Sequence, residues 1–380
     1  MSKQLSEPRP FTVHIPDQVL ADLRDRLARS RIPDDSPRRP VSGMTTAYLR
    51  GLVDDWIGWS WRAREAWLNA HPQFLAEVGD VDLHFVHLRS EQPDAPALLV
   101  LHGWPHTFAL QLDFADLLPD FHVVVASLPG FGFSAPYTEG EMSEKRLAAT
   151  MHRLMADVLG YERYFTYGED VTANVSDLIA ARYPEHVAGI VATHAHFPTS
   201  EERAALTDPA EKEFFDELAA KHRTDGAYGH VQATRPDTLA TALNDSPAGL
   251  LAWLTEKLVE WSDTPPGDPA AVERRISRDR ILTEATIYWA TQTIASSFRP
   301  YYEGADQPGP IPPTGVPAAV FVQRHERTYP ESLARRHYLD LRVFDRLAEG
   351  GHFTVGEVPD EMAVRVREFV RSVDYPSAGP

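Results

Sequence analysis

An aspartate stands between an apolar run and a helical pattern in the middle of the chain. Residues 165–168 (Phe-Thr-Tyr-Gly) predict a buried strand, and residues 173–181 have the pattern of a helix. Asp170 lies at the turn between them, and its neighbours Gly168 and Thr172 are small enough for a tight turn. A carboxylate is ionised at neutral pH, so at such a turn it can attack a carbon and form an ester. The alternative is that Asp170 only caps the helix, because Asp is a favoured N-cap residue.

Two loops contain the other groups that an aspartate nucleophile needs. The apolar run 98–101 is followed by His102-Gly103-Trp104-Pro105, and Gly350-Gly351-His352-Phe353 precedes a helical pattern over 359–373. When the nucleophile stands between a strand and a helix, an early loop of the first kind contributes to the oxyanion hole, and a late histidine acts as general base. We therefore expect the backbone N–H groups of Trp104 and Val171 to form the oxyanion hole and His352 to activate water.

This histidine needs a carboxylate that follows Asp170 and precedes His352 in the chain. Residues 316–323 predict a strand, and Glu326 lies just beyond its end. The rivals are Glu331, Asp340 and Asp345. We expect the first of these to begin a helix after Pro330, where the helix dipole favours an acid in any case, and the last to lie in a later strand. Glu326 is therefore the best-placed candidate.

Strand and helix patterns alternate around these loops. Strands are predicted over 81–88, 97–101, 122–127, 164–167 and 187–194, with helices over 144–159 and up to residue 182. This alternation is typical of an α/β protein with a mostly parallel sheet. We expect four parts: an N-terminal helical extension (1–80), the first part of the α/β core (81–197), a helix-rich lid (198–310) and the second part of the core (311–380).

The chain resembles the epoxide hydrolases of the microsomal and juvenile-hormone type over nearly its whole length. The matching motifs are HGWP at 102–105, the aspartate at 170, SPAGLLAWLTEK at 246–257 and GGHF at 350–353. The resemblance implies the α/β-hydrolase fold and an enzyme that converts an epoxide to a vicinal diol through an ester on the aspartate, with no cofactor. In that family the catalytic acid lies ten residues beyond a Val-Pro pair, and Val316-Pro317 again points to Glu326.

The same resemblance implies two lid tyrosines that hold the epoxide oxygen. The first matches Tyr228, within Tyr-Gly-His-Val-Gln, and the second matches Tyr301, after Ser-Ser-Phe-Arg-Pro, with Tyr302 as a rival. A phenol can donate a hydrogen bond or a proton to the alkoxide that ring opening generates. The alternative for each tyrosine is a packed aromatic residue with a satisfied hydroxyl. The expected substrate-binding residues are His102, Trp104, Pro105, Phe131 and Trp253.

Two stretches depart from the family pattern. The residues around the aspartate usually read Gly-Gly-Asp-Trp-Gly, whereas this chain has Glu169, Val171 and Thr172. The loop after HGWP usually continues Gly-Ser, whereas this chain has His106 and Thr107. Neither change removes a catalytic group, and together they suggest an unusual substrate or a reaction that has drifted.

Composition restricts the partners of the protein. The 380 residues include 37 Lys plus Arg and 55 Asp plus Glu, which gives a formal net charge of −18 and disfavours nucleic acid and anionic membrane. There is no cysteine, so disulfides and thiol nucleophiles are excluded. No third ligand lies near His194 and His196 in the sequence, so we expect no metal site there. We expect a cytoplasmic location, because the first residues hold no apolar run of signal-peptide length, and consider a homodimer plausible.

Three other functions compete with epoxide hydrolysis. A haloalkane dehalogenase uses the same nucleophile, but its halide site usually includes a tryptophan directly after the aspartate, where this chain has Val171. A relative that opens an epoxide with an internal nucleophile would keep the tyrosines and could dispense with the water-activating pair. A non-catalytic binding protein on the same fold is supported only by the altered residues around Asp170.

Overall fold

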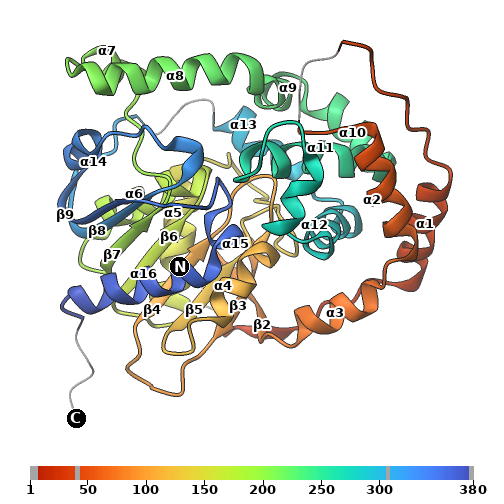
Figure 1. The fold of residues 1–380 in the computed structure, drawn as a ribbon. Helices are drawn as coiled ribbons and strands as arrows, with labels where there is room; N and C mark the ends of the chain where they lie inside the picture. The colour runs from red at the N-terminus through yellow and green to blue at the C-terminus, as the bar shows by residue number, and fades with distance from the viewer. Residues whose placement is uncertain (1–6, 39–42, 305–308, 376–380) are drawn as a thin grey trace.

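A nine-stranded sheet runs through the protein (Figure 1), with the strand order β1-β2-β3-β5-β4-β6-β7-β8-β9. The computed structural model describes residues 7–38, 43–304 and 309–375. The strands are β1 (Arg9–Phe11), β2 (Gln73–Val78), β3 (Val81–Leu88), β4 (Ala97–Leu101), β5 (His122–Ala126), β6 (Tyr164–Gly168), β7 (Val187–Ala192), β8 (Thr314–Val322) and β9 (Tyr338–Arg346). The neighbouring strands from β5 through β4, β6, β7 and β8 to β9 are parallel to one another. The neighbouring strands from β1 through β2 and β3 to β5 are antiparallel. The predicted α/β class is confirmed.

Helices cover both faces of this sheet because side chains alternate along each strand. Leu99 and Leu101 of β4 belong to the apolar cluster that includes α5 (Glu144–Arg153) and α6 (Val171–Arg182). Leu98 and Val100 belong to the cluster on the other face, with α4 (Leu112–Asp116) and α16 (Pro359–Ser372). A π-helical turn, Leu154–Val158, extends α5. The continuous apolar runs of the sequence therefore correspond to strands buried on both sides.

The segment between β7 and β8 is helical, as expected for a lid. It consists of α7 (Ser200–Ala204), α8 (Pro209–Asp225), α9 (Ala227–Thr234), α10 (Pro236–Asp245), α11 (Pro247–Trp261), α12 (Arg278–Thr291) and α13 (Arg299–Glu303), with 3₁₀ turns at Pro269–Arg274 and Ser296–Phe298. After β8 come a 3₁₀ turn at Arg324–Glu326 and α14 (Glu331–His337), and the histidine loop leads into α15 (Thr354–Glu357). A 3₁₀ turn at Phe108–Gln111 precedes α4.

The N-terminal extension contains α1 (Asp17–Ala28), α2 (Thr46–Gly58) and α3 (Trp61–Asn69), which pack beside α11 and α12 (Figure 1). Trp56 of α2 helps to hold the extension in place: it is buried, and its Nε1 donates to Thr286 Oγ1 of α12 at 2.9 Å. The helical reading of residues 1–80 is wrong at two places, because β1 and β2 are strands. They are short strands at one end of the sheet, and pairing with β3 rather than their own periodicity selects that conformation.

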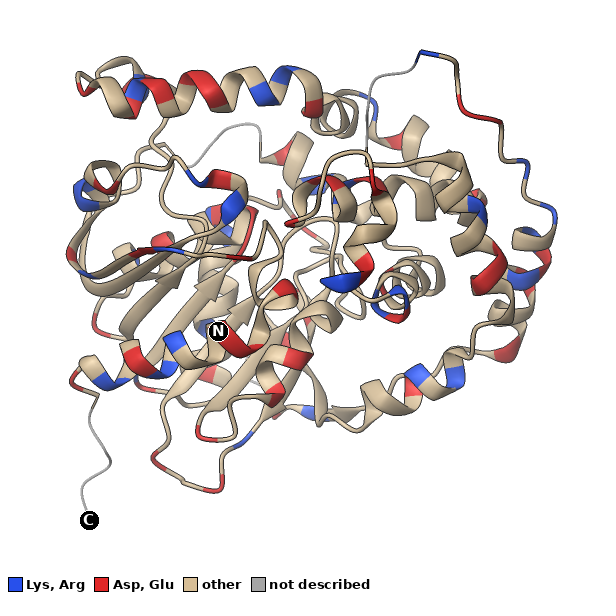
Figure 2. Ribbon diagram, in the orientation of Figure 1, with Lys and Arg blue, Asp and Glu red and all other residues tan. Residues whose placement is uncertain are grey.

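Acidic and basic residues are interspersed along the helices, for example along α8 and α16 (Figure 2). The acidic residues, which outnumber the basic ones, are thus distributed over many helices and loops and, among the described residues, do not form one cluster. Within the described ranges, no helix combines the length and the apolar character that crossing a membrane requires.

We predict that the extension unfolds together with the core. Leu52 of α2 is fully buried, so Leu52→Ala should lower the free energy of unfolding by about 2–5 kcal/mol, the usual cost of a buried leucine. Leu339→Ala is the control, because Leu339 is 66% exposed, and should change it by less than about 0.5 kcal/mol. Urea unfolding followed by circular dichroism and by tryptophan fluorescence measures both variants. An unchanged midpoint for Leu52→Ala would contradict the prediction.

Candidate active site

Asp170 occupies a strained turn between β6 and α6. Its backbone has φ 54° and ψ −131°, a conformation that non-glycine residues rarely adopt and that occurs at functional turns. The turn is tight, since a Cβ on Gly168 would lie 2.2 Å from the carbonyl oxygen of Thr172. Asp170 stands at the N-cap position, yet its side chain makes no capping hydrogen bond. The structure therefore contradicts the interpretation of Asp170 as a helix cap.

Backbone N–H groups surround the Asp170 carboxylate. The N–H of Trp104 donates to Oδ1 at 3.2 Å, and the N–H of Val171 also stabilises the charge. Gly103 permits this approach, because a Cβ there would lie 2.3 Å from Asp170 Cβ. Burial alone would raise the pKa of Asp170, but His352 and the two N–H groups outweigh it and lower the pKa. The expected oxyanion donors thus lie beside an ionised carboxylate.

His352 faces the same carboxylate from the loop before α15. Its Nε2 lies 3.6 Å from Asp170 Oδ2, and its backbone N–H donates to Trp261 O at 2.8 Å. Burial acts to lower the pKa of His352, but its interaction with the Asp170 carboxylate, with a smaller contribution from the charge of Glu326, raises it overall. Nucleophile and base therefore meet as the sequence predicts.

Glu326 also lines the site, but it does not contact His352 in the predicted way. The hydrogen-bond partner of His352 Nδ1 is His194 Nε2, at 3.0 Å, and no hydrogen bond joins Glu326 to His352 among the described residues. Burial raises the pKa of Glu326 to about 7, and the charges of His352 and Lys221 oppose this shift. The contact of His194 with His352 has no signal in the sequence, because only the fold brings the end of β7 beside the histidine loop.

The two predicted tyrosines lie together at the site. Tyr228 of α9 and Tyr301 of α13 have ring centroids 5.9 Å apart, and both rings pack against Trp104. Removal from water, followed by the neighbouring tyrosine and the charge of Asp170, raises the pKa of Tyr301, and burial and Asp170 do the same for Tyr228. Both hydroxyls therefore retain their protons. Tyr302 is 38% exposed and does not line the cavity, so the structure places Tyr301 rather than its neighbour at the site.

These groups line one cavity of about 470 Å³. Its polar lining includes Asp170, His194, Tyr228, Tyr301, Glu326 and His352, and its apolar lining includes Trp104, Phe131, Met142, Leu147, Val171, Phe197 and Pro300.

Of the expected substrate-binding residues, Trp104 and Phe131 line this cavity, whereas His102, Pro105 and Trp253 are not among its lining residues. The ring of His102 is buried, with Nδ1 donating to Gly103 O at 3.0 Å and Nε2 accepting from the N–H of Leu128 at 3.1 Å. The indole N–H of Trp253 donates to Gln232 Oε1 at 3.1 Å. His102 thus supports the loop, and Trp253 holds two lid helices together.

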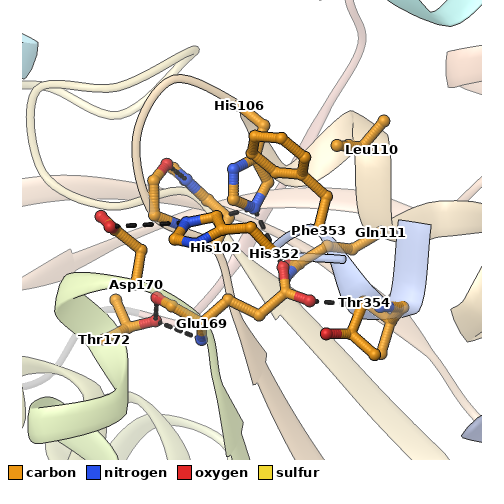
Figure 3. Close-up of polar contacts among 12 residues, drawn as sticks. His102, His106, Leu110, Gln111, Glu169, Asp170, Thr172, His352, Phe353 and Thr354 are labelled. Carbon is orange, nitrogen blue, oxygen red and sulfur yellow. Dashed lines mark hydrogen bonds and ion pairs between the residues drawn. The ribbon is translucent and has the colours of Figure 1, made fainter. Parts of the chain in front are cut away.

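The two departures from the family pattern contact each other (Figure 3). Glu169 points away from Asp170, and its Oε2 lies 3.1 Å from His106 Nε2, with both side chains buried. Glu169 Oε1 accepts from the Tyr167 hydroxyl and, at 3.2 Å, from the N–H of Val355. Burial would raise the pKa of Glu169, but the hydrogen bonds from His106 and Tyr167 outweigh it and lower the pKa. One carboxylate therefore connects the turn, the HGWP loop and the histidine loop.

A further histidine cluster lies beside α6. Asp177, His196 and His337 bring one ligand atom each within 4.8 Å of one another, although His337 is distant from His196 in the sequence. The rings of His196 and His337 stack at 3.8 Å with an interplanar angle of 10°. A metal-bound imidazole lone pair lies in its ring plane, and one ion cannot lie in two such parallel planes. His196 Nδ1 and the Tyr338 hydroxyl bond the two oxygens of Asp177, at 3.1 and 2.9 Å, so we interpret the group as a hydrogen-bonded cluster.

The fold and the site define an α/β hydrolase with an aspartate at the nucleophile position. The protein-family model described as "Epoxide hydrolase N terminus" matches residues 8–110, and the family model described as "alpha/beta hydrolase fold" matches residues 96–293. A putative epoxide hydrolase from Stigmatella aurantiaca is 34% identical, covering 96% of this chain and 85% of that protein. Epoxide hydrolase 1 from Sus scrofa is 30% identical, covering 95% and 88%. The chain therefore belongs to the epoxide hydrolase family.

Solved structures agree with this assignment. The juvenile hormone epoxide hydrolase from the silkworm Bombyx mori has a TM-score of 0.86 at 25% identity, covering 97% of this chain and 95% of that one. The Aspergillus niger epoxide hydrolase has a TM-score of 0.80 at 28% identity, covering 97% of both chains.

We predict that Asp170→Asn lowers the pKa of His352. Asn has the shape of the carboxylic side chain without its charge, so the protonated histidine loses its main counter-charge while its burial remains. Titration of the histidine by NMR in the wild-type and variant proteins measures the shift. Asp216→Asn, on an exposed residue of α8, removes the same charge and should leave the pKa unchanged. An unaltered value in Asp170→Asn would contradict the pairing.

Proposed function

We propose that this epoxide hydrolase acts through a covalent ester on Asp170. In the first step a carboxylate oxygen of Asp170 attacks one carbon of the epoxide and the ring C–O bond breaks. The epoxide oxygen leaves as an alkoxide and takes its proton from the Tyr228–Tyr301 pair. The low pKa of Asp170 and the raised pKa values of the tyrosines support this assignment, because they keep the nucleophile ionised and the acids protonated.

In the second step water attacks the carbonyl carbon of the ester. His352 Nε2, which faces Asp170, takes a proton from the water, and the N–H groups of Trp104 and Val171 hold the oxyanion. The intermediate collapses by releasing the diol, whose leaving oxygen receives the proton from His352 Nε2. The second proton of the water leaves as the Asp170 carboxylate is regenerated and returns to the tyrosine pair. Esterification removes the negative charge of Asp170 and so lowers the pKa of His352. The histidine therefore loses its proton more readily in the step in which it must act as a base.

The observation that carries this proposal is the sharing of one cavity by the Asp170 carboxylate and two tyrosines. A dehalogenase needs donors for a halide, and Val171 has no side-chain donor at the position where that class usually has tryptophan. Ring opening instead needs an acid for an alkoxide, and two phenols in contact can serve as that acid. A ring-forming relative would not need His352 beside the nucleophile.

Oxygen labelling in a single turnover tests the covalent step. With excess enzyme in ¹⁸O water, the label should enter the Asp170 carboxylate, because water attacks the ester carbonyl and not the substrate carbon. Mass spectrometry of the peptide that contains Asp170 and of the diol measures its position. Label in the diol after one turnover, with none in the peptide, would mean direct attack by water and would refute the ester.

Tyr228→Phe and Tyr301→Phe should each slow the alkylation of Asp170 about a hundredfold, since losing one donor to a developing oxyanion costs about 3 kcal/mol. Hydrolysis of the ester should be much less affected, because the alkoxide exists only in the first step. Stopped-flow measurement of both steps separates the effects. Tyr302→Phe is the matched control on the partly exposed neighbour and should behave like the wild type. A defect in Tyr302→Phe alone would reassign the second donor.

A further inference from the structure

A continuous series of hydrogen bonds leads from His352 away from the cavity and into the sheet. His352 Nδ1 contacts His194 Nε2 at 3.0 Å, and His194 Nδ1 contacts Thr193 Oγ1 at 3.5 Å, the longest link. Thr193 Oγ1 contacts the Tyr167 hydroxyl at 3.1 Å, and that hydroxyl donates to Glu169 Oε1. The path thus begins at the general base and ends at the carboxylate that departs from the family pattern.

The Glu169 carboxylate, at the end of the path, determines which group donates and which accepts in each hydrogen bond. An ionised carboxylate can only accept, so Tyr167 must donate to Glu169 and accept from Thr193. Thr193 in turn accepts from His194 Nδ1–H, which leaves His194 Nε2 with a lone pair. His352 must then carry its proton on Nδ1 and donate it to His194. Its Nε2 therefore keeps the free lone pair that a general base requires.

The bonds of Glu169 hold it in the ionised, accepting state. Its side chain is 1% exposed, and it receives hydrogen bonds from His106, Tyr167 and the N–H of Val355. A buried carboxylate is costly unless it is paired in this way. The two residues that differ together from the family pattern thus provide a charge, in Glu169, and a donor that keeps it ionised, in His106.

We propose, on the basis of the ester mechanism above, that His194 orients the general base His352 and that Glu169 sets the polarity of the path through Tyr167 and Thr193. No proton travels along the path: His352 takes the proton of water on Nε2 and keeps its own on Nδ1. His194 and Glu169 are positioning residues, and Glu326 acts on His352 through its charge. A single carboxylate beside the histidine usually both orients it and stabilises its positive charge. Here Glu169 contributes to the orientation, and Glu326 contributes charge.

The first test separates alkylation from hydrolysis of the ester. His194→Phe keeps an aromatic ring but removes the acceptor for His352 Nδ1, so ester hydrolysis should slow at least about tenfold and the alkyl-enzyme should accumulate. Tyr167→Phe removes only the hydroxyl that joins Thr193 to Glu169, and should slow the same step to a smaller extent. Rapid quenching followed by mass spectrometry of the intact protein measures the alkyl-enzyme over time.

Thr166→Val is the matched control for Tyr167→Phe. Its hydroxyl is buried in the same strand and has no hydrogen-bond partner within the described residues, so its loss should leave both steps unchanged. If His194→Phe and Tyr167→Phe hydrolyse the ester at the wild-type rate, the proposal is wrong. If the wild type itself turns over no epoxide and forms no alkyl-enzyme, the proposed function fails instead, and the two results are distinguishable.

The pH dependence of ester hydrolysis gives a second readout, which a merely structural role would not move. The ionisable groups that face or influence His352 are Asp170, Glu169, Glu326, His194 and His325. The negative charge of Glu169 raises the pKa of His352, so Glu169→Gln should shift the acidic limb of the profile to lower pH. Tyr167→Phe retains that charge and should shift the limb less. An unshifted limb in Glu169→Gln, with a normal rate, would overturn the role of Glu169.

Discussion

A largely buried carboxylate that must stay ionised is the constraint on which this structure depends. The side chain of Asp170 is only 20% exposed, and burial alone would make it a neutral acid and a poor nucleophile. The strained backbone at residue 170 turns the carboxylate toward the N–H of Trp104, and Gly103 lets that loop approach. His352 supplies the remaining positive charge. The glycine in the loop, the strained backbone at Asp170 and the position of His352 therefore all serve to keep this carboxylate ionised.

Much of this arrangement could be predicted from local patterns. The apolar runs around residues 98–101 and 165–168 became β4 and β6, because strands buried on both faces read as continuous apolar runs and these runs have the length of a strand. The resemblance to a family pointed to Tyr228 and Tyr301, and burial then separated Tyr301 from its neighbour. The short strands β1 and β2 were missed, because pairing at the end of the sheet and not their own periodicity determines them.

Contacts between distant residues could not be read in the same way. Glu169 and His106 each looked like an isolated departure, and only the fold shows that their side chains meet at 3.1 Å. The partner of His352 is His194, from the end of another strand, although Glu326 is the residue that its position in the chain favours. Parallel strands bring their carboxyl ends to one edge, so residues far apart in sequence converge there. Which of them touch depends on side-chain directions that no local pattern contains.

The lid is attached to the rest of the protein at two places, and polar contacts contribute most at α8. Helices α11 and α12 pack against the N-terminal extension, where Leu52 and Trp56 are buried. Helix α8 is attached by aromatic packing, with Phe214 buried against Tyr329 of the segment after β8, and by polar contacts, including the ion pair of Glu211 with Arg336 and the bond from Thr328 to Glu217. Water and salt compete with exposed polar contacts far more readily than with a packed apolar face. A rise in ionic strength should therefore weaken the polar part of the α8 attachment and leave the apolar packing of both parts of the lid in place.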